Sequence, residues 1–110
     1  MDRLEILKNS KVISENTYDK AKKAEKFLLK ELKQSECFEM MITHYSMALE
    51  RMMKNEKIDS LSEEGIKEIE NHKNYKHSIK LLEELNKITE TKLSVEEEKY
   101  ILLHLLNLIN

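Results

Sequence analysis

CFEMMITHYSMALERMMK, residues 37–54, is the stretch that decides the fold, because its apolar residues recur with the period of an α-helix. At about 3.6 residues per turn, one side of this helix forms an apolar stripe of Phe38, Met41, Ile42, Tyr45, Leu49 and Met52. His44 lies about 100° from the centre of that stripe, on a flank shared with Cys37, Met40 and Arg51. We therefore expect a helix over residues 37–55 with a histidine at the margin of the core.

The composition predicts that the rest of the chain is helical too. Its 110 residues include one glycine and no proline, so the residues that make tight β-hairpins are almost missing. Apolar residues make up 40% and charged residues 36%, and the abundant Lys, Glu, Leu and Met are good helix formers. A chain of this length forms one domain with a real core. The expected fold class is all-α, a compact bundle of about five helices.

The same periodicity places the other helices. We expect a short helical turn over residues 2–8, and helices over residues 17–34, 60–71, 75–88 and 94–109. Asn16 or Thr17 is the expected N-cap of the helix over residues 17–34, whose outer lysine-rich face is interpreted as a solvated surface. Capping boxes are expected where a serine precedes a glutamate by three positions, at Ser60–Glu63 and Ser94–Glu97.

The segment YILLHLLNLI, residues 100–109, is apolar on nearly every side and is interrupted by His104. Such a helix is buried within its own domain or shares a face with a second chain. Because a small domain would struggle to cover it alone, we expect a homodimer in which this helix or the His44 helix contributes to the contact. Asn107 lies one turn beyond His104, where its amide can orient the imidazole through a hydrogen bond.

Spacing alone allows two interpretations of the histidines. In the first, His44 and His104 are ordinary core-margin histidines, and Arg51 is a surface residue whose aliphatic stem packs on apolar neighbours. In the second, His44 and Arg51, seven residues apart on nearly the same line of the helix, form a site for an anion or a phosphoryl group. His72 and His77 lie near a predicted turn and are interpreted as surface residues.

Charge, cysteine content and hydropathy exclude several classes of protein. A net charge of −2 lacks the basic surface of a nucleic-acid binder, so no direct nucleic-acid binding is expected. A single cysteine is compatible with a reducing cytoplasm. The N-terminal MDRLEILKNSK lacks the apolar run of a signal peptide, and no window approaches the ~20 apolar residues of a membrane span. We expect a cytoplasmic protein with no membrane partner.

The two histidine helices together resemble those of the PTS regulation domain (PRD), a module of bacterial sugar-response regulators. MITHYSMALERM resembles the first PRD signature, a histidine followed by a small residue and an arginine, here His44, Ala48 and Arg51. EEEKYILLHLLN resembles the second, here Glu98, Tyr100, His104 and Asn107. The histidines lie 60 residues apart (104 − 44), as in the family, and the resemblance covers residues 18–110.

The resemblance implies a non-enzymatic regulatory domain, with residues 1–17 as an N-terminal extension. It implies that His44 and His104 are phosphorylation candidates, that Arg51 binds the phosphoryl group and that Asn107 orients a ring. The donor would be the phosphocarrier HPr or a sugar-specific enzyme IIB of the sugar phosphotransferase system, with no cofactor. A free-standing, antiterminator-related domain of this kind would act through protein contacts in transcriptional or carbohydrate regulation.

Two alternatives stay open. A helical adaptor or dimerisation module would use the same helices without phosphorylation. A metal-binding bundle would bring together Cys37, His44, His104 and Asn107. We expect no metal, because the two histidine helices lack the Glu-x-x-His pairs of helical carboxylate sites.

Overall fold

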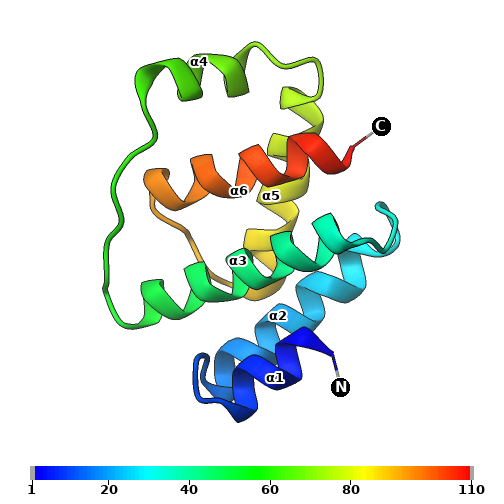
Figure 1. The fold of residues 1–110 in the computed structure, drawn as a ribbon, viewed down its shortest axis with the longest axis vertical. Coiled ribbons are helices and arrows are strands. Elements are labelled where there is room, and N and C mark those ends of the chain that lie inside the picture. Colours follow the sequence, from blue (N-terminus) through cyan, green and yellow to red (C-terminus); the bar gives the residue numbers. More distant parts are fainter. Residues whose placement is uncertain (1, 110) are drawn as a thin grey trace.

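The chain folds into an all-α bundle, as expected, in a computed structural model that describes residues 2–109 (Figure 1). Six helices occur in this range: α1 (Arg3–Asn9), α2 (Glu15–Leu28), α3 (Glu36–Met53), α4 (Glu63–Glu70), α5 (Tyr75–Thr89) and α6 (Val95–Leu108). There is one more than the expected five because the short N-terminal segment is a helix in its own right. The Asp2 carboxylate caps α1 by accepting from the Glu5 amide, and Leu4 is buried under it.

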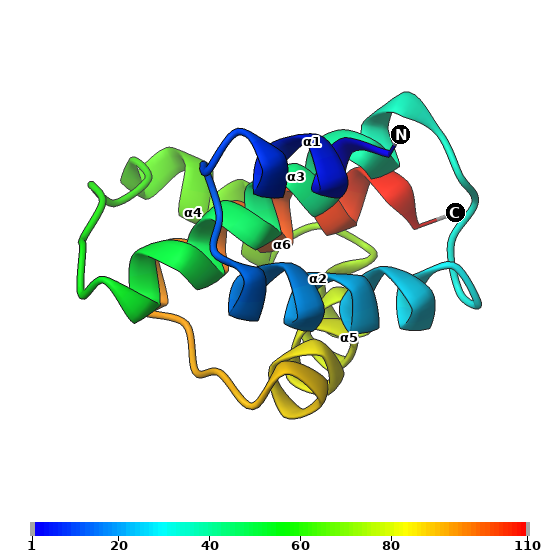
Figure 2. The same ribbon diagram turned by 90° about the horizontal axis from the view of Figure 1, so that it is seen from below.

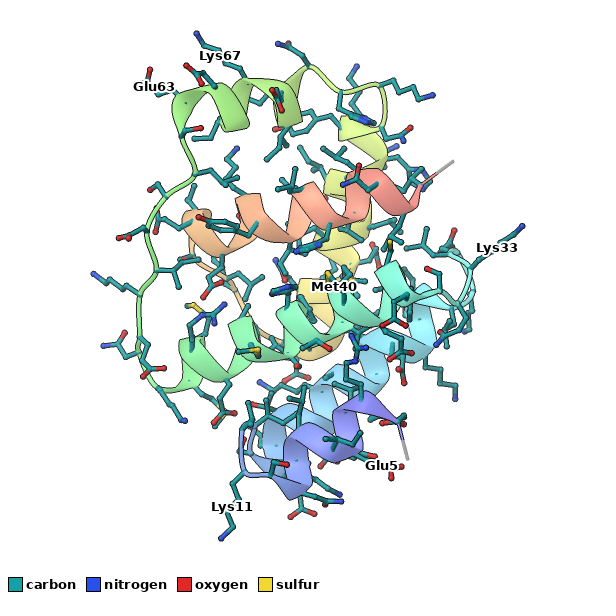
Figure 3. All side chains as sticks on the ribbon, in the orientation of Figure 1. Glu5, Lys11, Lys33, Met40, Glu63 and Lys67 are labelled. Carbon is teal, nitrogen blue, oxygen red and sulfur yellow. The ribbon has the colours of Figure 1, made fainter. Side chains whose placement is uncertain are left out.

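The helix that carries His44 lies beside the C-terminal helix. The two run in opposite directions, and α4 lies on the other side of α6 from α3 (Figure 1). Turning the molecule shows α1 packed over α2 and α3, and α5 on the far side of α2 (Figure 2). The predicted stripe of α3 is buried from Phe38 to Leu49, with Phe38, Met41, Ile42 and Tyr45 fully enclosed, whereas Met52 at its end is partly buried. The labelled charged side chains at Lys11, Lys33, Glu63 and Lys67 point away from the bundle (Figure 3).

Several helix ends differ from the predicted ones. The N-cap of α2 is Ser14, whose hydroxyl accepts from the Thr17 amide, so the prediction of Asn16 or Thr17 was wrong. Ser14 is preferred because its own amide and hydroxyl also donate to the buried carboxylate of Glu50. The helix ends at Leu28, and turns replace the expected helix to residue 34.

The capping box predicted at Ser60–Glu63 is also wrong. Ser62 caps α4 instead and accepts from the Gly65 amide. At the start of α6, Ser94 caps as predicted by accepting from the Glu97 amide. The Glu97 side chain, however, binds Arg51 on α3.

The apolar C-terminal helix is covered largely by its own chain. Helices α3, α4 and α5 all contact α6 and bury most of its large side chains: Ile101, Leu102, Leu105 and Leu106. Leu103 is 38% exposed. A second chain is therefore not required to cover most of the apolar surface of α6, in contrast to what the sequence suggested. None of the helices between residues 2 and 109 combines the length and apolar character needed to cross a membrane.

Candidate functional site

The site is built around two stacked imidazoles. The ring centroids of His44, on α3, and His104, on α6, lie 4.6 Å apart with 19° between the ring planes. The prediction that these histidines lie close together on facing helices is confirmed. His44 is exposed and His104 is half-buried, so the pair is open to solvent. A protein partner can therefore approach at least one of the two rings directly.

The imidazoles open onto a cavity of about 390 Å³. Its other walls come from α3, from α6 and from the loop between α3 and α4. The lining residues are His44, Arg51, Ile58, Asp59, Glu97, Tyr100, Ile101 and His104. Both phosphorylation candidates and the predicted anion-binding arginine therefore line one cavity.

Arg51 reaches across the cavity to α6. It lies seven residues after His44, and Glu97 lies seven residues before His104, so antiparallel helices bring them opposite each other. Nε of Arg51 donates to one carboxylate oxygen of Glu97 at 2.6 Å, and Nη2 donates to the other at 2.9 Å. Side-chain exposure is 26% for Arg51 and 2% for Glu97. The hydrogen bond to Glu97 is the main cause of a raised pKa at Arg51.

Glu97 is the site residue that sequence reasoning missed. Its position three residues after Ser94 indicated a capping box, in which the carboxylate would turn back to the serine amide. In the structure it binds Arg51 instead, although the amide of Glu97 still donates to the Ser94 hydroxyl. The matching seven-residue offsets from the two histidines were the available signal. They became informative only once the helices were known to be antiparallel.

Asn107 does not line the histidine cavity. Its amide donates to the Leu103 carbonyl oxygen at 3.2 Å, and its side chain lines a second cavity that also contains Cys37 and His77. The residues of the metal alternative are thus divided between two cavities. Across residues 2–109, no three His, Cys, Asp or Glu side chains are grouped so that they could hold a metal ion.

Glu98, the first residue of the second signature, also lies outside the histidine cavity. It accepts a hydrogen bond from the Asn86 amide on α5 at 3.2 Å, and burial raises the pKa of its carboxyl. His77 is exposed, as expected, whereas His72 is half-buried and accepts from the Asn74 amide at 3.0 Å. The structure therefore gives Glu98 and His72 roles at helix contacts and turns.

The surroundings of His104 favour its neutral form. Burial lowers the pKa of its imidazole below the ordinary value of 6.5, and a positive charge on the adjacent His44 lowers it further. A neutral imidazole has a free nitrogen lone pair and is therefore a nucleophile. The other charged groups that line this cavity are Arg51, Glu97 and Asp59.

The lowered pKa of His104 predicts a pH-dependent stability. The unfolded chain binds a proton at His104 at a higher pH than the folded chain does, so folding becomes less favourable as pH falls below about 6.5. The loss levels off below the folded pKa. We expect His104→Gln to flatten this part of the profile when urea unfolding is measured between pH 7.5 and pH 5. Replacing exposed His77 with Gln is the control and should leave it unchanged. Equal profiles for His104→Gln and wild type would contradict the assignment.

Comparison with known proteins identifies a family for the chain. The family model described as the PRD domain matches residues 7–108 of the chain, and this range contains both histidines and the Arg51–Glu97 pair. No curated protein and no solved structure matches significantly.

Proposed function

Since the chain belongs to the PRD domain family, we propose that it accepts a phosphoryl group on His44 or His104 from the sugar phosphotransferase system. A PRD is a regulatory module under the control of that system, and it is not a catalytic domain. The proposed donor is HPr or a sugar-specific enzyme IIB. The output is a change in protein contacts that regulates transcription or carbohydrate use in the cytoplasm, without direct binding to nucleic acid.

The observation that carries this proposal is the stacked histidine pair at the mouth of a cavity that holds a guanidinium. Imidazole is substantially neutral and nucleophilic near pH 7. Phosphoryl transfer depends mainly on positioning and charge stabilisation, and the donor protein supplies part of both. The acceptor nitrogen forms a bond to phosphorus while the donor's bond to phosphorus breaks. The acceptor ring then loses a proton and the departing donor group gains one.

Of the two histidines, His44 is proposed as the main acceptor. It is the exposed member of the pair and shares α3 with Arg51, whereas His104 is half-buried. The guanidinium can hold phosphoryl oxygens through charge-assisted hydrogen bonds. His104, stacked 4.6 Å away, would support the ring and serve as an alternative acceptor, with one phosphoryl group on the pair at a time.

The test is reconstitution of the donor chain. The purified protein is incubated with phosphoenolpyruvate, enzyme I and HPr, with and without a purified enzyme IIB, and its intact mass is followed. We expect the mass of one phosphoryl group to appear only when the complete donor chain is present. The alternative, a helical adaptor without phosphorylation, predicts no added mass with any donor.

We also propose a homodimer that associates through the surface around His44 on α3 and His104 on α6. Four exposed apolar residues lie on the helices that carry the histidines: Met40 and Met53 on α3, and Val95 and Leu103 on α6. Met40 (47% exposed) lies one turn before His44, and Leu103 (38% exposed) directly precedes His104 in the sequence. If Met40 and Leu103 contact a second chain, a phosphoryl group on the nearby histidine pair would change the strength of that dimer contact. Leu103→Glu should shift the protein toward monomer in sedimentation velocity at tens of micromolar, where modest interfaces form. Val95→Glu, an exposed site in the first turn of α6, is the control. A wild-type monomer at this concentration would count against the proposal.

A further inference from the structure

The histidine cavity is poorly prepared for an anion in its present state. Arg51 is the one Lys or Arg side chain among its lining residues, and both its Nε and its Nη2 are already bonded to Glu97. Asp59 lines the same cavity, and the negative charge of Glu56 also acts on Arg51. A phosphoryl group would bring about −1.5 to −2 further charges into this cavity at pH 7. Acidic groups therefore outnumber the arginine before any phosphorylation occurs.

The Glu97 carboxylate competes with a phosphoryl oxygen for the Nε and Nη2 edge of the Arg51 guanidinium. A bidentate pair occupies one edge of the guanidinium, the geometry that phosphate also prefers. Glu97 is 2% exposed and cannot easily move into water when Arg51 leaves it. An ionised carboxylate left buried without a partner is costly, so the pair resists release.

We propose that Glu97 is a gate on Arg51: it holds the guanidinium in the unmodified protein, and a phosphoryl group on His44 takes Arg51 from it. This inference rests on the proposed function and adds a residue that controls both acceptance and lifetime of the modification. The exchange couples chemistry to structure, because the Arg51–Glu97 pair joins α3 to α6. When the phosphoryl group captures Arg51, the contact between these helices loses its ion pair. Phosphorylation would thereby weaken the contact between α3 and α6.

The two possible roles of Glu97 predict opposite effects of Glu97→Gln on the rate of phosphorylation. If Glu97 only orients Arg51, removing its charge slows phosphorylation. If Glu97 competes for Arg51, Glu97→Gln keeps the size of the side chain, weakens its hold on the guanidinium and favours the phosphorylated state. We expect faster uptake, and loss of the phosphoryl group slowed on the order of tenfold, which corresponds to about 1.4 kcal/mol.

The experiment uses phosphoramidate as a small donor, so that it does not depend on recognition of HPr or enzyme IIB. Its P–N bond breaks as the imidazole nitrogen bonds to phosphorus, ammonia departs, and the phosphorylated ring releases its proton to solvent. Intact mass gives the rate of uptake, and after removal of the donor it gives the rate of loss. Glu96→Gln, which removes the same charge from the first turn of α6, is the matched control and should behave as wild type.

A second variant shows whether the effect passes through Arg51. In Arg51→Met/Glu97→Gln, the slower loss should disappear, and circular dichroism establishes that this variant is folded. Uptake in Glu97→Gln that equals or falls below wild type would overturn the gate while leaving the proposed function intact. A wild-type protein that takes no label on His44 or His104, either from phosphoramidate or from the complete donor chain, would overturn the proposed function and the gate together.

Discussion

Replacing His44 with alanine is expected to abolish most of the phosphoryl uptake from the phosphotransferase donor chain. His44 is the exposed ring of the stacked pair, and it lies on the same helix as Arg51. A donor protein that must bring its phosphoryl group within bonding distance reaches this ring before the half-buried His104. The measurement is the initial rate of mass gain with enzyme I, HPr and phosphoenolpyruvate.

His104→Ala is the matched control because it removes the other ring of the same stack. We expect it to retain most of the uptake, with some loss because His44 loses its stacking neighbour. A result in which His104→Ala loses the label and His44→Ala keeps it would reverse the assignment of the main acceptor. That result would still place the phosphorylation site at the histidine pair.

The second large effect is on stability. Arg51→Met is expected to lower the free energy of unfolding by about 3 kcal/mol, because it leaves the buried Glu97 carboxylate without its cation. The value is at the lower end of the range for buried pairs, because Arg51 is itself 26% exposed. Glu97 also lies in the first turn of α6, where the helix dipole favours a negative charge. Urea unfolding at pH 7 measures the change.

The double variant Arg51→Met/Glu97→Met tests whether an unpaired charge is the cause. Replacing both partners with apolar side chains of similar length removes the buried charge, so most of the lost stability should return. Arg3→Met breaks an exposed ion pair with Glu36 at 3.0 Å and should cost at most about 1 kcal/mol. If the double variant is as unstable as Arg51→Met, the loss comes from packing of the arginine stem.

The helical parts of the fold were predictable because burial imposes a period on the sequence. The stripe of α3 from Phe38 to Leu49 is buried as its spacing indicated. The helix starts were less predictable, because neighbouring polar residues offer several caps. Ser14 was chosen over Asn16 through its contact with Glu50, which lies 36 positions away in sequence. No local pattern contains that information.

The candidate site was predictable in part for the same reason. The resemblance and the spacing singled out His44, His104 and Arg51, and the structure places all three at one cavity. Glu97 was assigned to its own helix end because a capping box is a local pattern. Its partner Arg51 is 46 positions away and depends on the antiparallel arrangement of α3 and α6. Asn107, one turn from His104 in sequence, bonds to a backbone carbonyl of its own helix instead.

The most direct test of the central claim is the phosphorylation stoichiometry of the wild type beside the double variant His44→Ala/His104→Ala. Both proteins are incubated with the complete donor chain, and their intact masses are measured under conditions that preserve phosphohistidine. The account predicts one added phosphoryl group on the wild type and none on the double variant. Equal labelling of the two proteins would contradict it.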